Sequence, residues 1–272
     1  RTQEKTRPDV SGKLSWILSD RRLYSKRVPG KTCLSALEGG VMGTVEKPLN
    51  DSTTCGAVMR SAPVGLWMST LNATVQQTAT LATQLAALTH GNPRAWLTAA
   101  LHAIIIRNII LLDGKDLYTI IQESLTDFRS CFETQKHLRK ITTLMYTALD
   151  ITKLSFDNDS DAIKLIGEGW EADEALAIAI YCAVKHSDDF SKAIISAVNH
   201  DGDSDSVGTL CGNIIGAYLG IDKIPDKFKE RLELSDLITE ISNDLYSGKP
   251  NPSDLIETEK WNEKYIDCDF ML

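Results

Sequence analysis

Apolar residues recur at helical spacing along most of this chain, and alternating β-branched residues are scarce. In the segment 73–89, ATVQQTATLATQLAALT, the apolar positions follow i, i+3 and i+4 spacing, and the pattern stops at HGNP. Pro93 is well placed to open the next helix, because the first turn of a helix does not need the N–H that proline lacks. We expect this next helix to continue to about Leu112, just before the sequence DG.

Further helices are predicted by the same periodicity in the second half of the chain. The one that starts at Glu171 carries acidic residues in its first turn, which the helix dipole favours. Together these segments predict an all-α fold, a single compact bundle of about ten helices that occupies residues 1–272 as one domain. The additional predicted helices cover residues 117–128, 135–154, 171–186, 189–198, 206–219 and 234–245.

Two features indicate how the bundle packs. Gly208, Gly212 and Gly216 recur every fourth residue along one helix face, which suits close contact with a neighbouring helix. The segment 96–112, WLTAALHAIIIRNIILL, is the most apolar of the chain, but it contains a histidine, an arginine and an asparagine. It is also slightly short for a bilayer span, so we predict a buried central helix and no membrane association.

Composition narrows the class of protein. Of 272 residues, 43% are hydrophobic and 24% are charged, which is enough to build a large core and excludes a disordered chain. The net charge of −8, without a Lys/Arg-rich run, argues against a nucleic-acid surface. Six scattered cysteines without a CxxC pair, and a charged segment at 1–13 in place of a signal peptide, predict reduced thiols and a cytoplasmic protein.

Candidate chemistry is concentrated in the segment NHDGDSDSVG, where Asp201, Asp203 and Asp205 alternate ahead of a helix. An EF-hand is excluded, because its sixth position needs glycine and its twelfth glutamate, whereas Ser206 and Gly212 stand there. A helix cap would explain only one of the three carboxylates. The other interpretation is a cation site in which a turn at the intervening glycine brings two carboxylates and a serine hydroxyl together. Such oxygen donors suit Mg²⁺ and Mn²⁺.

Four loops combine glycine with small polar residues just ahead of a helical pattern. Backbone N–H groups at such junctions bind anions, phosphate included. With the carboxylate cluster, these loops predict a pocket for a phosphorylated ligand that contains a sugar. The loops cover residues 28–33, 48–60, 88–95 and 167–175.

The same segments carry a resemblance to a known family. PGKTCLSALEGG, NDSTTCGAVMRSAPVGL, LTHGNPRA, GEGWEADEALAIAIYCAV and NHDGDSDSVGTLCGNIIGAYLG resemble the successive motifs of the ADP-ribosylglycohydrolases, which include the dinitrogenase-reductase-activating glycohydrolase. They occur in the family's order and span residues 29–220. The resemblance implies an all-α hydrolase with two divalent cations, Mg²⁺ or Mn²⁺. It also implies cleavage of the bond between ADP-ribose and a modified protein side chain or small molecule.

The resemblance assigns roles to individual residues. Asp203, Asp205 and Ser206 match the family's C-terminal metal-ligand motif, whereas Asp201 is interpreted as lying outside the ligand set or facing solvent. The catalytic acid is not identified in this chain. The residues that match the family's ADP-ribose pocket are Gly30, Thr32, Asn50, Ser52, Gly56, Arg60 and His90, with Gly169 and Trp170 over the adenosine end.

Plainer interpretations stand beside three of these assignments. For His90 the alternative is a residue that satisfies carbonyl groups at a helix end, for Arg60 a structural cation paired with a carboxylate, and for Trp170 core packing. Cys55 is interpreted as a small buried apolar residue and not as a nucleophile.

The chain also departs from the family pattern. Neither the glycine-rich first helix with its catalytic glutamate nor the Thr-Asp-Asp motif is present, and in a full-length member both would precede Arg1. Two carboxylates and one hydroxyl are too few for a two-metal cluster, so we expect this chain alone to bind metal weakly or not at all. The chain is then a fragment, one half of a two-chain enzyme, or an inactive relative that binds ADP-ribose or a modified partner without turnover.

Overall fold

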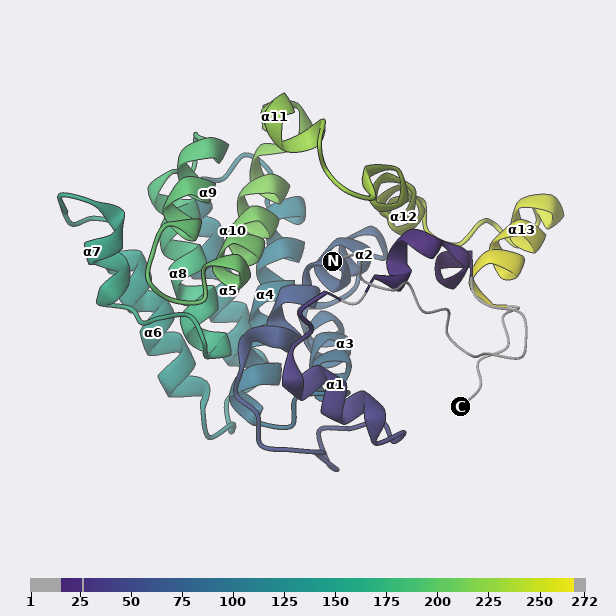
Figure 1. Cartoon of the computed structure of the whole chain (residues 1–272), viewed down its shortest axis with the longest axis horizontal. Coiled ribbons are helices and arrows are strands. Elements are labelled where there is room, and N and C mark those ends of the chain that lie inside the picture. The colour runs from purple at the N-terminus through teal and green to yellow at the C-terminus, as the bar shows by residue number, and fades with distance from the viewer. Residues whose placement is uncertain (1–15, 26, 267–272) are drawn as a thin grey trace. The chain divides into compact units, whose positions relative to one another are not determined.

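The structure is a computed structural model that describes residues 16–25 and 27–266, and its regular elements are helices (Figure 1). Thirteen α-helices and four 3-10 helices lie in these residues, which contain no strand. The expectation of an all-α fold is confirmed. The number of helices exceeds the predicted ten because several are only four to eight residues long, as in α1, α7 and α11, and so are too short for a periodic pattern.

Packing divides the chain into two compact units. One is Gly30–Arg231, and the other combines the described residues before Gly30 with those from Leu232 to Ile266. The smaller unit contains η1 (Trp16–Ser19), η2 (Arg21–Tyr24), α12 (Ser235–Ser247) and α13 (Leu255–Tyr265). The larger unit contains α1 (Lys31–Glu38), η3 (Cys55–Arg60), α2 (Ala62–Thr70), α3 (Val75–Ala87), α4 (Pro93–Leu111), α5 (Leu117–Cys131), α6 (Leu138–Ile151), α7 (Asp159–Lys164), α8 (Ala172–Lys185), α9 (Phe190–Val198), α10 (Ser204–Leu219), η4 (Ile221–Lys223) and α11 (Asp226–Lys229).

Helix α4 forms the centre of the larger unit. It packs against α2, α3 and α5, and also against α8 and α10. Among the helices described, α4 alone has the length and apolar composition of a membrane span, but 78% of that window is buried inside the protein. Its polar side chains find partners, since the Arg107 guanidinium donates to the Ala73 carbonyl at 2.8 Å and Asn108 Nδ2 donates to Asp127 Oδ2 at 2.9 Å. The segment is therefore a core helix, as its interrupted apolar pattern indicated.

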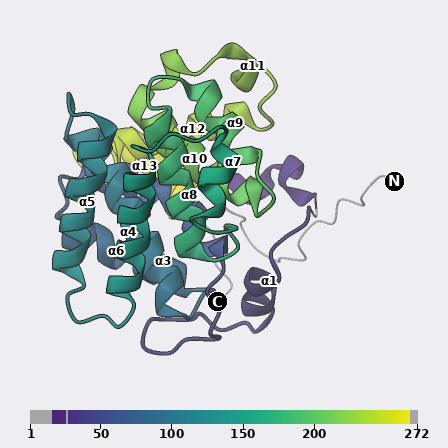
Figure 2. The same cartoon turned by 90° about the vertical axis from the view of Figure 1, so that its left-hand side faces the viewer.

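The spaced glycines of α10 face α9. Figures 1 and 2 show α8, α9 and α10 side by side, and these three helices pack against one another. A Cβ added at Gly208 would lie 2.6 Å from Val198 Cγ1, which is too close for any side chain. A Cβ at Gly212 would lie 3.6 Å from Ile194 Cδ1, an ordinary contact. The close contact between α10 and α9 that the glycine spacing predicts is therefore present at Gly208, whereas at Gly212 the two helices are separated by an ordinary van der Waals distance.

Local capping sets several helix boundaries. Helix α3 begins with a capping box between Thr74 and Gln77, and α5 is capped by Asp116, whose side chain accepts the N–H of Thr119. Helix α6 is shorter than predicted because residues 132–138 form successive turns, with the Gln135 N–H donating to the Phe132 carbonyl at 2.9 Å. Helix α10 begins at Ser204, two residues before the predicted start, and Asp203 occupies its N-cap position.

Candidate active site

A row of hydrogen-bonded side chains joins three loops of the larger unit. Thr32 Oγ1, in the first turn of α1, lies 3.1 Å from Ser52 Oγ, which lies 3.0 Å from Thr54 Oγ1. Thr54 Oγ1 in turn lies 3.1 Å from Nε2 of His90, just ahead of α4. The structure thus brings the predicted residues Thr32, Ser52 and His90 together. Thr54 completes the row, although the sequence did not single it out.

His90 is fully buried, and its other ring nitrogen also has a partner. Nδ1 lies 2.8 Å from Thr89 Oγ1, which accepts an N–H of Arg60 at 2.7 Å. The Thr89 proton is then available to Nδ1, which favours the tautomer with the ring proton on Nε2, facing Thr54. Burial, and then the charge of Arg60, lowers the pKa of His90 to about 4. The ring is therefore neutral near pH 7.

Arg60 is exposed, and it also donates to the Leu85 carbonyl at 3.2 Å, so part of its guanidinium supports the end of α3. Its partners are a carbonyl and a hydroxyl, with a third contact of 3.8 Å to Cys33 Sγ. The pairing with a carboxylate that was considered for this residue is not among these contacts.

Asn50 ties its own loop to the His90 loop. Its Oδ1 accepts the N–H of Ser52 at 3.0 Å and the N–H of Gly91 at 3.1 Å, and its Nδ2 donates to the Thr89 carbonyl at 2.8 Å. A Cβ at Gly91 would lie 2.0 Å from the Asn50 carbonyl oxygen, so the two loops touch along their backbones. The Asn50 amide therefore acts within the protein and shapes the site.

Gly56 lies directly beside the histidine ring. A Cβ there would lie 3.1 Å from Cε1 and Nε2 of His90 and 3.5 Å from Cys33 Sγ. A larger residue would therefore push against the ring that ends the hydroxyl row.

A short antiparallel pairing connects this region to the loop ahead of α8. Thr54 and Glu171 form an isolated β-bridge, in which the Ala172 N–H donates to the Thr53 carbonyl at 2.9 Å. The Cys55 N–H donates to the Trp170 carbonyl at 3.3 Å. Residues 53–55 are thus fixed by main-chain bonds to residues 170–172.

Arg94, in the first turn of α4, strengthens this connection. Its guanidinium holds the fully buried Asp173 carboxylate through two hydrogen bonds, and its Nη1 lies 3.3 Å from Glu171 Oε2. A bidentate arginine–carboxylate pair has a defined geometry, so it fixes the start of α8 against the start of α4.

Gly30, Gly169 and Trp170 are not members of the hydroxyl row. Gly30 is the exposed N-cap of α1, and a Cβ there would meet open space. Gly169 has a φ of +84°, and a Cβ there would lie 2.9 Å from Val207 Cγ2, so glycine is favoured. The Trp170 side chain is 55% exposed, which rules out its interpretation as core packing and leaves its ring accessible.

The predicted cation donors lie at the start of α10. Asp203 is buried, and Ser206 in the first turn of α10 is also buried, whereas Asp205 is exposed. The Cys55 thiol donates to Asp203 Oδ2 at 2.9 Å and lies 3.3 Å from Ser206 Oγ. Asp201 is exposed, as expected for a residue outside the ligand set.

The carboxyl groups of Asp203 and Asp205 influence each other. Burial, and then the hydrogen bond with Asp205, raises the pKa of Asp203. The same hydrogen bond lowers the pKa of Asp205. Burial also raises the pKa of the Cys55 thiol to about 12, so near pH 7 this cysteine is a thiol and not a nucleophile.

The donor chemistry fits part of a cation site. Asp203, Asp205 and Ser206 offer the oxygen atoms that Mg²⁺ and Mn²⁺ take. Asp203 stands at the N-cap of α10, yet its carboxylate caps no N–H of that helix. Its orientation is therefore not explained by capping. Within residues 16–25 and 27–266, His, Cys, Asp and Glu side chains form no group of three that could hold a metal ion.

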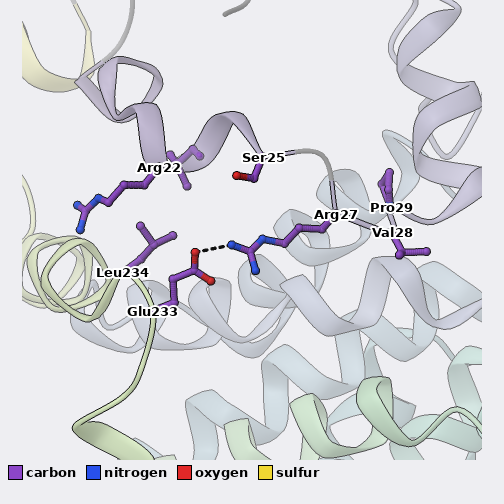
Figure 3. A pocket seen from close by; sticks show the side chains of 8 residues that line it. Arg22, Ser25, Arg27, Val28, Pro29, Glu233 and Leu234 are labelled. Carbon is purple, nitrogen blue, oxygen red and sulfur yellow. Dashed lines mark hydrogen bonds and ion pairs between the residues drawn. The ribbon is translucent and has the colours of Figure 1, made fainter. Parts of the chain in front are cut away.

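The smaller unit contains a separate hollow of about 550 Å³ (Figure 3). Its two arginines already have acidic partners, because Arg27 pairs with Glu233 and Arg22 pairs with Asp20 and Asp236. The predicted site residues all lie in the larger unit and do not line this hollow. The lining residues are Arg22, Leu23, Ser25, Arg27, Val28, Pro29, Glu233 and Leu234.

Fold and site together define an all-α protein in which a row of hydroxyl groups ending at a histidine lies near a buried carboxylate at a helix start. The sequence profile of the ADP-ribosylglycohydrolases matches residues 2–254, and the chain belongs to that family. The resemblance seen in its five motifs is thereby confirmed. The assignment of residues 1–272 to one domain stays a prediction.

Individual relatives agree with this membership. The chain is 30% identical over 240 residues to an uncharacterised protein of Archaeoglobus fulgidus, a match that covers 85% of the chain and 69% of the relative. It is 25% identical over 206 residues to the human ADP-ribosylhydrolase ARH3, which covers 65% of the chain. The matched part is 53% of the human protein, so the chain spans about half of that relative's length.

A solved structure shares the fold. The structure of an ADP-ribosylglycohydrolase-related protein complex superposes with a TM-score of 0.61 at 22% sequence identity. The superposition covers 80% of this chain and 69% of the other.

Proposed function

We propose that this protein hydrolyses the glycosidic bond between ADP-ribose and a modified protein side chain or small molecule, assisted by Mg²⁺ or Mn²⁺. One observation carries the proposal beyond family membership. The neighbouring residues Thr54 and Cys55 reach different halves of the site, the first to His90 and the second to Asp203. The predicted pocket residues and the predicted cation donors therefore meet at one short segment.

The hydroxyl row suits the phosphate and ribose groups of ADP-ribose. With the His90 proton directed at Thr54 and each hydroxyl group donating to the next, the row leaves one proton, that of Thr32, to donate to a ligand oxygen. Neutral His90 supports the end of this row without adding charge, since both of its ring nitrogens contact threonine hydroxyl groups. The protein thus contributes positioning, which lowers the entropic part of the barrier.

The cation donors occupy the other half of the site. Asp203, Asp205 and Ser206 would hold the divalent cation, whose chemistry is to orient the ribose hydroxyl groups and activate water. Because Asp203 is buried and already turned away from the helix N–H groups, its carboxylate needs little rearrangement to serve as a donor.

The test is ADP-ribose release from an ADP-ribosylated protein with Mg²⁺ or Mn²⁺. Asp203→Ala and Asp205→Ala should each abolish release, because each removes a charged donor. Ser206→Ala should be milder, since water can replace a neutral hydroxyl group. Release that survives Asp203→Ala would overturn the assignment of the cation donors.

A second function, binding of ADP-ribose without turnover, is favoured by the small number of cation donors. The described residues offer no group of three His, Cys, Asp or Glu side chains for a metal. Calorimetric titration with ADP-ribose separates the two functions when it is run beside the release assay. Binding that is lost in Thr32→Val, with no release from wild type, would support this second function.

A further inference from the structure

Three cations without acidic partners stand together at the connection between α5 and α6. Lys136, Arg139 and Lys140 are exposed, and no aspartate or glutamate occurs in the sequence between Glu133 and Asp150. Within the described part of the chain, none of the three takes part in an ion pair. These three residues, the basic edge, therefore leave uncompensated positive charge on the surface of a protein whose net charge is −8.

The turn ahead of the basic edge packs against the start of α4. The ring of Phe132 lies 6.4 Å from that of Trp96, measured between centroids. Trp96 is buried near the start of α4, and His90, which ends the hydroxyl row, precedes it by only six residues. The basic edge and the hydroxyl row therefore both adjoin the start of this helix.

The charges around His137 agree with this placement. Burial, and then the charges of Lys136, Arg94 and Lys140, lowers the pKa of His137, while the charge of Asp173 acts in the opposite direction. Arg94 and Asp173 form the ion pair that fixes the start of α8 against the start of α4. His137 thus lies within electrostatic reach of that pair, and the two lysines next to it stand at the rim of the candidate active site.

We propose that the basic edge binds acidic residues that flank the modified side chain in a protein substrate. The inference rests on the proposed function and narrows its substrate class to ADP-ribosylated segments rich in aspartate or glutamate. An extended peptide covers about 3.3 Å per residue, so residues a few positions from the modified side chain can reach the far side of the α4 start. Opposite charges across such a contact speed association and select between partners, even though each exposed pair adds little affinity.

The size and surroundings of the basic edge favour a short acidic segment over a nucleic acid. Affinity for nucleic acid grows with the number of phosphates that a protein neutralises along the backbone. The basic edge supplies three cations on a protein of net charge −8, so a long polyanion would meet repulsion beyond them. Two or three carboxylates on a peptide match this small positive surface.

The experiment measures peptide binding to the full 272-residue chain by fluorescence polarisation, in buffer without divalent cations, where the proposed hydrolysis does not proceed. Two labelled peptides carry the same ADP-ribosyl modification, one with glutamates and the other with glutamines at the flanking positions. We expect wild type to bind the glutamate peptide about three- to tenfold more tightly at low ionic strength, and this preference to shrink in about 0.5 M salt.

Neutral substitutions in the basic edge should remove the preference for glutamate. The test variant combines Lys136→Gln with Lys140→Gln. The matched control combines Lys153→Gln with Lys192→Gln, which removes the same charge from two ion pairs with an acid three residues away and should retain the preference. Lys153 follows the far end of α6, about 20 Å along the helix from the basic edge.

Equal affinity for the two peptides in wild type would overturn the inference, as would a preference that survives the paired Lys136 and Lys140 substitutions. Tighter, lysine-dependent binding of a single-stranded oligonucleotide would overturn it in favour of nucleic acid. Weaker binding of free ADP-ribose in the test variant would overturn it by assigning the lysines to the nucleotide itself. Free ADP-ribose bound by wild type with equal peptide affinities defeats this inference alone. A glutamate preference without ADP-ribose binding or release defeats the proposed hydrolysis alone.

Discussion

Gly202 and Glu168 meet backbone to backbone, so closely that a Cβ on Gly202 would lie 1.8 Å from the Glu168 carbonyl oxygen. The same carbonyl oxygen accepts the N–H of Asp203. The position of the buried carboxylate therefore depends on the absence of a side chain at the preceding residue.

We expect Gly202→Ala to destabilise the protein by about 1 to 3 kcal/mol, because an added methyl group forces the backbone apart. The matched control is Gly212→Ala, where the new Cβ makes an ordinary contact and alanine favours the helix by up to about 1 kcal/mol. Urea unfolding of both variants measures the difference. Similar unfolding free energies for the two would contradict the close approach at Gly202.

Removal of the Arg94 side chain should lower the free energy of unfolding substantially. Arg94→Ala leaves the fully buried Asp173 carboxylate without its cation, and a buried pair broken in this way typically costs about 3 to 5 kcal/mol. Addition of Asp173→Asn should restore part of the loss, since the unpaired charge is then gone. The control is Lys115→Ala at an exposed ion pair with Glu123, where we expect less than about 1 kcal/mol. Thermal unfolding that ranks the two single variants equally would refute this account.

Thr54→Val tests the hydroxyl row with little change of shape. The variant removes the hydrogen bonds to Ser52 and His90, so we expect ADP-ribose affinity to fall by about tenfold, corresponding to roughly 1 to 1.5 kcal/mol. Thr126→Val on α5, whose hydroxyl bonds only the Gln122 carbonyl of its own helix, should leave the affinity unchanged. Calorimetric titration measures both. Unchanged affinity in Thr54→Val would remove the row from the binding site.

Stability should decline as the pH is lowered from about 6.5 to 4. Burial lowers the pKa of His90 and of His102 to about 4, whereas in the unfolded chain both lie near about 6.5. Within this window the unfolded state binds protons that the native state does not, so the free energy of unfolding falls with pH. The contribution is fully present above pH 6.5 and amounts to roughly 3 kcal/mol per histidine.

Urea unfolding at several pH values measures this decline. In NMR spectra of the folded protein, the ring Cε1–H signals of these two histidines should stay at their neutral positions down to about pH 5, given a native pKa of about 4. A titration midpoint near neutrality for either ring would contradict its buried, neutral state.

The helices that could be predicted from the sequence are those marked by neighbouring residues, such as a capping residue or a periodic apolar run. Pro93 and the apolar run that follows predicted α4 almost to the residue, and α5 begins at the predicted Leu117 behind its Asp116 cap. Helix α1 was not predicted, because eight residues are too few for a repeated apolar pattern and only Ala36 is buried. Four-residue helices such as α11 give no periodic signal at all.

The sequence identified the loops that form the candidate active site, but it did not identify which of their residues contact one another. Glycine and small polar residues marked the loops of Asn50, His90 and Gly169, and the structure brings these loops together. The pairing of Thr54 with Glu171 and the contact of Cys55 with Asp203 join residues far apart in the sequence. Such contacts depend on how the helices pack, for which a single sequence carries no local pattern. The binding roles of the predicted residues stay predictions.

The bridge between residues 53–55 and 170–172 has a consequence for ligand affinity. Thr54 and Cys55 share one peptide group, so a ligand that orders the hydroxyl row also restrains the thiol beside Asp203. Linkage then requires reciprocity, in that ADP-ribose would strengthen cation binding by the same factor as the cation strengthens ADP-ribose binding. Under the proposed function, ADP-ribose and the cation would therefore bind cooperatively, and the Thr54–Cys55 peptide group would connect their two binding sites.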